Sequence, residues 1–261
     1  MKVGFIGCGN MGSALAGAVA RVEGVELYLA DNNIDKATAL AEKLGARVCD
    51  NIYMVEGCDI VFLAVKPNIV PAVCTEIKDY ITKGTLVVSM AAGVKLTALC
   101  EWLGTERVIR IMPNTPVLVG DGMITWARGG KITENDVNNF TRVLSYAGTL
   151  DEIDEKLIDA ATAVAGCGPA FVYLFAEALA DAGVECGLAR DKALLYAATT
   201  LRGAADMILE TGKHPGQLKD EVCSPGGSTI VGVRALEEGG FRAIAGNAVV
   251  SAYEKTKKLG D

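Results

Sequence analysis

Three glycines at positions 7, 9 and 12 follow directly after a short apolar run, residues 2–6. In the pattern Gly-x-Gly-x-x-Gly, the first glycine permits a tight turn, the second lets a pyrophosphate approach the backbone, and the third allows a helix to pack closely on a strand. The alternative is a flexible bend. A strand pattern before the glycines and a helical pattern after them favour a dinucleotide-binding turn, because a helix N-terminus attracts anions. The predicted turn comprises Gly7, Cys8, Gly9, Asn10, Met11 and Gly12.

The acidic residue Asp31 ends the second predicted strand, nineteen residues beyond Gly12. A carboxylate at this point accepts hydrogen bonds from a ribose 2′-OH and repels a 2′-phosphate, which favours NADH over NADPH. Asn32, Asn33 and Lys36 offset this preference, because they donate hydrogen bonds to a phosphate. The alternative role for Asp31 is the N-cap of the next helix.

Two further segments follow predicted strands, at the edge where open α/β sheets bind ligands. The first is Ala64, Val65, Lys66 and Pro67, and the second is RIMPNTP, residues 110–116. In the second segment the amide of Asn114 is suited to orient a nicotinamide or a substrate. The alternative is that both segments are only stiff exits from strands.

Near the C-terminus, SPGGSTI (residues 224–230) places two glycines before another predicted helix. A helix start without bulky side chains lets the backbone N–H groups of Gly227, Ser228 and Thr229 face an anion. An ordinary N-cap by Ser or Thr is the alternative, but two adjacent glycines exceed what a cap needs. The segment AGCGPAF (165–171) is a second passage of small residues.

Composition excludes several classes of protein. The chain of 261 residues carries a net charge of −7, whereas a nucleic-acid binder needs a basic surface. Its eight cysteines include no Cys-x-x-Cys pair and His214 is the only histidine, so we expect reduced thiols and no metal site. Glycines interrupt the uncharged runs 3–20 and 160–176. We therefore expect no membrane span and a cytoplasmic location.

Apolar runs alternate with helical patterns through the first half of the chain, which predicts a parallel sheet covered on both faces. After about residue 150 only helical periodicity remains. The predicted fold is an N-terminal Rossmann-type doubly wound domain (1–152) followed by an all-helical domain (153–261). Several of the later helices are apolar nearly all round, which favours a subunit interface over an ordinary monomeric core. The predicted strands are residues 2–7, 25–30, 59–65, 85–90 and 107–112, and the later helices are 157–166, 169–187, 190–212 and 229–241.

The motifs GFIGCGNMG, FLAVKP, SMAAG, RIMPNTP, GCGPAFVY, HPGQLKDEV and CSPGGSTI, with LEEGGFR, occur in this order. Together they resemble the pyrroline-5-carboxylate reductase family from residue 2 to about residue 258. The resemblance implies NAD(P)H-dependent reduction of the C=N bond of L-1-pyrroline-5-carboxylate to L-proline. It also implies a Rossmann domain, a helical dimerisation domain, and dimers that often assemble into decamers.

The resemblance assigns roles to residues at matching positions. It places the pyrophosphate on the Gly7–Gly12 turn and the substrate carboxylate on SPGGST, with the Thr229 hydroxyl against the ring nitrogen. Glu155 matches a position near the proline site in some relatives. The implied cofactor residues beyond the turn are Asp31, Asn32, Asn51, Ala64, Val65, Lys66, Pro67 and Ala92, and the implied substrate residues are Ser224, Gly226, Gly227, Ser228, Thr229 and Glu155.

Some features depart from the family pattern or suggest other functions. Cys167 and Phe171 stand where the family often has serine and tyrosine, which puts local hydrogen bonding in doubt. A β-hydroxyacid dehydrogenase shares the glycine turn but needs a GxxxKxxNN pattern that this chain lacks. A regulator that binds a cofactor without catalysis has no need for the SPGGST segment.

Overall fold

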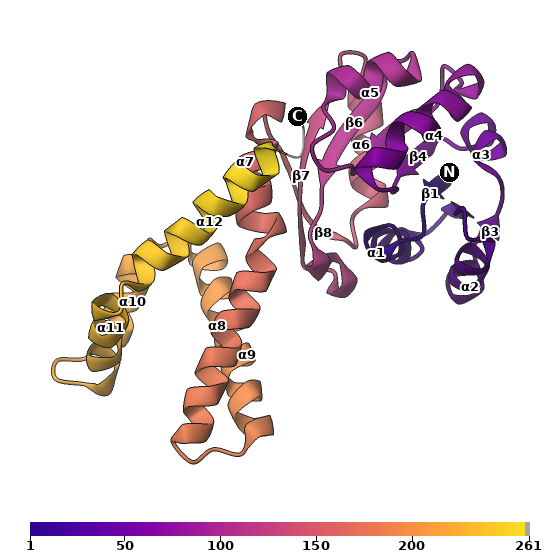
Figure 1. Ribbon diagram of the computed structural model, residues 1–261. Coiled ribbons are helices and arrows are strands. Elements are labelled where there is room, and N and C mark those ends of the chain that lie inside the picture. The colour runs from indigo at the N-terminus through magenta and orange to yellow at the C-terminus, as the bar shows by residue number, and fades with distance from the viewer. Residues whose placement is uncertain (259–261) are drawn as a thin grey trace. The chain divides into compact units, whose positions relative to one another are not determined.

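The computed structural model describes residues 1–258, and Figure 1 shows its helices and strands. The chain divides into two compact units. One comprises Met1–Cys167 together with residues 252–258, and the other comprises Gly168–Ser251. This division falls later than the predicted domain boundary at residues 152–153, because the segment 153–167 packs with the first unit.

The first unit is built on one eight-stranded sheet with the order β3-β2-β1-β4-β5-β6-β7-β8. Neighbouring strands are parallel except for β6 and β7, which pair antiparallel. The strand order reverses between β1 and β4, which are adjacent in the sheet but far apart in the sequence. The strands are β1 (Lys2–Ile6), β2 (Glu26–Ala30), β3 (Arg47–Val48), β4 (Ile60–Leu63), β5 (Leu86–Ser89), β6 (Val108–Met112), β7 (Gly122–Arg128) and β8 (Gly148–Glu152).

The five predicted strands are confirmed as β1, β2, β4, β5 and β6. The predicted parallel sheet is confirmed for these strands, and β7 and β8 extend it: β7 pairs antiparallel with β6, and β8 pairs parallel with β7. These two strands were absent from the prediction. In β7 the side chains of Ile124 and Trp126 are buried in one core, while Thr125 and Ala127 point to the opposite face.

Helices cover both faces of the sheet, as predicted. Leu15 of α1 and Phe140 of α6 belong to the core on one face, and Met54 of α3 and Leu99 of α5 belong to the core on the other. The rings of Phe5 and Phe62 stack with centroids 4.4 Å apart across neighbouring strands β1 and β4. The helices are α1 (Asn10–Val19), α2 (Ile34–Leu44), α3 (Asn51–Gly57), α4 (Val70–Ile77), α5 (Leu96–Leu103), α6 (Glu134–Val143) and α7 (Ile158–Ala161).

The second unit is helical, as predicted. In Figure 1 the hairpin of α8 and α9 is drawn in orange, and its two helices lie side by side. The unit buries little apolar surface by itself: its core is the small cluster Ala180, Ala193 and Ala197. Leu174 is 67% exposed and Leu209 is 81% exposed. The helices are α8 (Gly168–Glu185), α9 (Arg190–Thr211), α10 (Pro215–Val222), α11 (Ser228–Glu238) and α12 (Phe241–Lys257).

The glycines around Cys167 end one helical element and begin the next. The segment Glu155–Glu185 is helical apart from a bend at Cys167, which lies between the π-helical turn Thr162–Gly166 and α8. By length and composition it is the one helix among residues 1–258 that is long and apolar enough to cross a membrane. Only 17% of the most apolar 18-residue stretch of this segment is buried. An exposed apolar surface of this kind marks a site of interaction with another protein or with a membrane.

Candidate functional site

A cavity of about 1070 Å³ opens at the carboxyl ends of β1, β2 and β4. This is the point where the strand order reverses, and open α/β sheets bind ligands in the crevice at such a point. We call it the β1–β4 cavity. Eight of the predicted cofactor residues line it: Gly7, Gly9, Asp31, Asn32, Asn51, Ala64, Val65 and Lys66.

Two glycines of the turn are required by close packing. Gly7 has φ +106°, and a Cβ added there would lie 2.6 Å from the carbonyl oxygen of Ala64. A Cβ on Gly12 would lie 2.3 Å from the carbonyl oxygen of Gly7. At Gly9, by contrast, an added Cβ would meet nothing within 4 Å. The missing side chain at Gly9 therefore leaves open space beside the backbone, as a bound pyrophosphate requires.

The turn ends at the start of α1, where Gly9 is the N-cap. Gly9 is extended and provides no side-chain cap. The first N–H groups of a helix have no acceptor within the helix, so those of Asn10, Met11 and Gly12 are available to an anion. Packing, open space and uncapped donors together fit a dinucleotide at this turn.

Asp31 braces the same turn. Its Oδ2 accepts a hydrogen bond from the backbone N–H of Cys8 at 2.7 Å, and its Oδ1 accepts one from the backbone N–H of Asn33 at 2.9 Å. The N-cap of α2 is Asn33, so the alternative role of Asp31 as that N-cap was wrong. Burial, reinforced by the charge of Asp31, raises the pKa of the Cys8 thiol to about 11. The thiol is therefore protonated at neutral pH and is no nucleophile.

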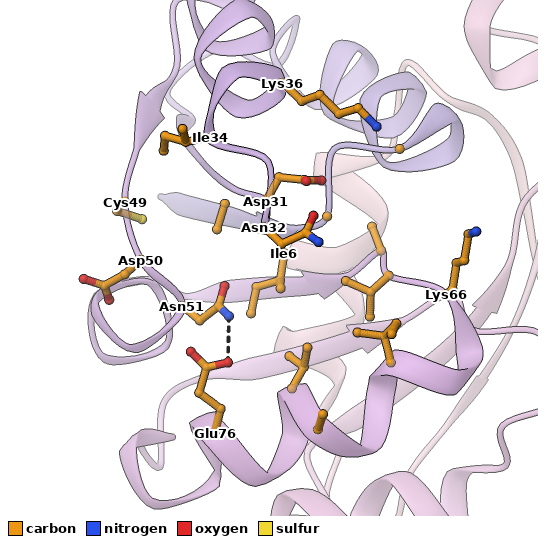
Figure 2. A pocket seen from close by; sticks show the side chains of 18 of the residues that line it. Ile6, Asp31, Asn32, Ile34, Lys36, Cys49, Asp50, Asn51, Lys66 and Glu76 are labelled. Carbon is orange, nitrogen blue, oxygen red and sulfur yellow. Dashed lines mark hydrogen bonds between the residues drawn. The ribbon is translucent and has the colours of Figure 1, made fainter.

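Figure 2 shows how polar side chains surround Asp31 and Asn32 in the β1–β4 cavity. Lys36 lies on one side of them, and Asn51 with Glu76 lies on the other. The amide Nδ2 of Asn51 donates to Glu76 Oε2 at 3.0 Å. One end of the cavity thus offers two carboxylates, two amides and an ammonium group, which suits the hydroxyls or phosphate of an adenosine ribose.

The predicted substrate residues 224–229 lie in the second unit. Gly226 has φ +69°, and Gly227 is the extended N-cap of α11 without a side-chain cap. The N–H of Gly227 donates to the carbonyl oxygen of Ser224 at 3.0 Å. The prediction that this N–H faces an anion is therefore corrected, and the N–H groups of Ser228 and Thr229 remain at the exposed helix start.

Comparison with known proteins identifies the family of the chain. A family model described as pyrroline-5-carboxylate reductase dimerisation matches residues 155–259, and one described as NADP oxidoreductase, coenzyme F420-dependent, matches residues 2–93. Pyrroline-5-carboxylate reductases from Pisum sativum and Escherichia coli are 44% and 43% identical, over 98% and 99% of this chain and 95% and 98% of theirs. The chain belongs to the pyrroline-5-carboxylate reductase family.

Solved structures agree with this assignment. A crystal structure of a Plasmodium falciparum pyrroline carboxylate reductase with NADP bound superposes with a TM-score of 0.88 at 36% identity. The superposition covers 100% of this chain and 98% of that one. The fold of the family, an N-terminal Rossmann-like sheet followed by a helical region, is therefore the fold of this chain.

Two residues assigned to ligands have protein partners. The Asn114 amide is buried; its Nδ2 donates to the carbonyl oxygen of Ala165 at 3.0 Å, and its Oδ1 accepts from the N–H of Met123 at 2.9 Å. Both polar atoms of this amide are thus engaged within the protein, and we correct its role from orienting a nicotinamide to holding the π-helical turn. Glu155 Oε1 accepts from Arg110 and from the start of α5, and its substrate role stays a prediction.

Two other predicted cofactor residues, Pro67 and Ala92, are not among the residues that line the β1–β4 cavity. Pro67 begins a 3₁₀ turn directly after Lys66, and Ala92 lies in the loop between β5 and α5. Arg110, which sequence reasoning overlooked as a functional residue, is a buried cation within an otherwise apolar strand, and that pattern was the available signal.

The glycine turn yields a prediction that separates binding from folding. Gly9→Ala is expected to leave the melting temperature unchanged, because its Cβ meets no atom, but to weaken NADH binding at least about tenfold by filling phosphate space. Gly12→Ala is the contrasting control, expected to lower the free energy of unfolding by about 1–3 kcal/mol through overpacking. Thermal unfolding and NADH titration measure both. Undiminished NADH binding by Gly9→Ala would contradict the assigned turn.

Proposed function

We infer that the protein reduces the C=N bond of L-1-pyrroline-5-carboxylate with a nicotinamide dinucleotide, giving L-proline. The observation that carries this inference is the full-length similarity to reductases of that name, together with the glycine turn at the β1–β4 cavity. This reaction is the last step of proline biosynthesis. We further propose the domain limits 1–152 and 153–261 for its cofactor and helical domains, and a cytoplasmic location.

The reductant is assigned to the first unit. The pyrophosphate would be held by the Gly7–Gly12 turn, the adenosine ribose by Asp31, Asn32 and Asn51, and the nicotinamide by the Ala64–Pro67 segment with Ala92. When bound, the reduced nicotinamide supplies a hydride. The protein's own part is to hold the ring and the imine in contact, and near-attack geometry of this kind contributes up to about 7–11 kcal/mol in favourable reactions.

The imino acid is assigned to residues 224–229. Its carboxylate would bind Ser224 and the uncapped N–H groups at the start of α11, where the helix dipole favours an anion. The Thr229 hydroxyl would hydrogen-bond the ring nitrogen and hold its proton. A protonated imine carbon is already electrophilic, so this chemistry needs no histidine, lysine or metal ion.

We propose NADH as the preferred reductant. The Asp31 carboxylate lines the β1–β4 cavity and would repel a 2′-phosphate while accepting hydrogen bonds from a 2′-OH. Lys36 lines the same cavity and would admit a 2′-phosphate with lower affinity. A similar reductase from Plasmodium falciparum has been solved with NADP bound. We therefore expect this protein to use NADPH as well, but with a lower kcat/KM than NADH.

We also propose a homodimer built by the helical unit. Its α8–α9 hairpin exposes large apolar side chains, and the family model over residues 155–259 describes dimerisation. Covering this surface with a second copy accounts for the apolar run Glu155–Glu185 without a membrane. The family resemblance implies that such dimers often assemble further, into decamers.

The direct test of this function is oxidation of NADH and NADPH by the purified protein in the presence of L-1-pyrroline-5-carboxylate. We expect turnover with this imine and L-proline as the product, identified by mass spectrometry. Hydroxyacids offered with NAD+ serve as the control for a dehydrogenase. Oxidation of hydroxyacids without reduction of the imine would refute the proposal and indicate a hydroxyacid dehydrogenase. Binding of NADH without any turnover would favour a regulator.

Thr229→Ala is expected to lower kcat by about 10²-fold or more, the usual contribution of a positioned proton donor. The Kd for NADH should change less, because the cofactor residues lie in the first unit. Thr229→Ser keeps a hydroxyl and is the matched control, expected to retain most of the turnover. Steady-state kinetics and NADH titration measure the two quantities; equal kcat for all three proteins would remove Thr229 from catalysis.

Asp31→Ser is expected to shift the ratio of kcat/KM for NADPH over NADH upward by at least about tenfold, or 1.4 kcal/mol, because it removes the charge that repels the 2′-phosphate. Asp35→Ser is the matched control, since Asp35 is a nearby exposed carboxylate in the first turn of α2 that does not line the cavity. Its ratio should match the wild type. An unaltered ratio in Asp31→Ser would refute the proposed cofactor preference.

A further inference from the structure

Arg110 lies at the centre of β6 with a side chain only 3% exposed. Its Nη1 donates to Glu155 Oε1 at 3.1 Å, and its Nη2 donates to Asp159 Oδ1 at 3.3 Å. Both carboxylates belong to the segment that follows β8. A buried guanidinium held by two carboxylates has one fixed geometry, because any other placement would leave buried charges without partners.

Glu155 also holds the start of α5. The same Oε1 that accepts from Arg110 accepts the backbone N–H of Leu96, the first residue of α5, at 2.6 Å. The N-cap residue of α5 is Lys95, whose side chain makes no capping hydrogen bond. Glu155 therefore takes the place of the N-cap side chain from 59 residues away, where a carboxylate also favours the helix dipole.

The start of α5 is one end of the loop 90–95, which follows β5. At the other end, the N–H of Met90 donates to the carbonyl oxygen of Leu63, the last residue of β4, at 3.3 Å. The loop thus lies next to the exit of β4, where Ala64 and Val65 line the β1–β4 cavity. Within the loop the hydrogen bonds are long: 3.4 Å from the N–H of Val94 to the carbonyl oxygen of Ala91.

Ala91 is buried in the core on one face of the sheet and Val94 packs against that core, so side-chain packing holds the middle of the loop. Hydrogen bonds hold its two ends, one to the sheet and the other to the carboxylate of Glu155. Because Arg110 holds that carboxylate in place, the guanidinium in β6 contributes to the position of the end of the loop at α5.

We propose that Arg110 and Glu155 are positioning residues for hydride transfer: they anchor the start of α5 and so hold the loop 90–95 against the nicotinamide. The assignment of this loop to the nicotinamide rests on the proposed function. Neither side chain touches substrate or cofactor in this proposal. Their effect is on the placement of the ring, and a small misplacement of reacting groups costs up to about 10²-fold in rate.

Asp159 provides a matched comparison within the same cluster. It is a carboxylate on the same guanidinium, with a side chain 28% exposed against 26% for Glu155. It makes no hydrogen bond to α5 among the described residues. Loss of either carboxylate should therefore lower stability by a similar amount, whereas only the loss of Glu155 releases the start of α5.

The experiment compares Glu155→Ala, Asp159→Ala, Arg110→Met and Arg110→Lys in the full-length protein. We expect kcat to fall at least about tenfold in Glu155→Ala and Arg110→Met, and to stay within about twofold in Asp159→Ala. Arg110→Lys keeps a cation that reaches Glu155, so it should recover part of the rate. KM for the imine and the Kd for NADH should each change by less than about fourfold, since residues 224–229 and the adenosine end of the β1–β4 cavity are intact.

The fluorescence of bound NADH gives a second readout that requires no substrate. It reports the surroundings of the nicotinamide ring, and we expect Glu155→Ala to alter it while Asp159→Ala does not. Thus the proposal is decided even if the wild type fails to reduce the imine. If Arg110→Met does not fold, the Glu155 and Asp159 variants still decide it.

Three results would overturn the proposal. Equal losses of kcat in Glu155→Ala and Asp159→Ala, matching their losses of melting temperature, would show a purely structural ion pair. A rise in KM for the imine without a fall in kcat would show that Glu155 contacts substrate directly. Unchanged fluorescence of bound NADH in Glu155→Ala would show that the loop does not follow the carboxylate.

Discussion

The glycine turn crosses the exit of β4 at close range. Gly7, Gly12 and Ala64 lie so near one another that a Cβ on either glycine would fall within 2.6 Å of a carbonyl oxygen. This contact exists because β1 and β4 are neighbours in the sheet, although 53 residues lie between Ile6 at the end of β1 and Ile60 at the start of β4. It aims the uncapped start of α1 at the crevice, so the anion site follows from how two strands pack.

Local patterns were sufficient to predict β1, β2, β4, β5 and β6, because each is a continuous apolar run between two turn signals. They were insufficient for the two-residue strand β3 and for β7 and β8. In β7, Ile124 and Trp126 alternate with Thr125 and Ala127, and that alternation acquires meaning only when β7 lies against β6 with helices on both faces. The π-helical turn at Thr162–Gly166 has a similar origin, since the Asn114 amide, distant in sequence, holds its carbonyl.

For the candidate site, the sequence predicted which residues lie close together. It did not predict which of their polar atoms are already hydrogen-bonded to other protein groups. The glycine turn and Asp31 were placed correctly at one cavity because strand ends determine where they fall. Asn114, Glu155 and the N–H of Gly227 were assigned to ligands, yet each has a protein partner. A polar group binds a ligand or the protein with the same chemistry, so residue type and spacing alone do not show which of its atoms already has a protein partner.

Asp31 combines both roles in one carboxylate. Its two oxygens hold the turn through Cys8 and the start of the α2 segment through Asn33, and the same group faces the β1–β4 cavity. Each carboxylate oxygen accepts more than one hydrogen bond, so a ribose hydroxyl adds to these bonds without breaking them. In the proposed function, the charge that would select the ribose is held in place by the turn that would bind the pyrophosphate. Cofactor preference and phosphate geometry would then be coupled, and a change at Asp31 would act on both.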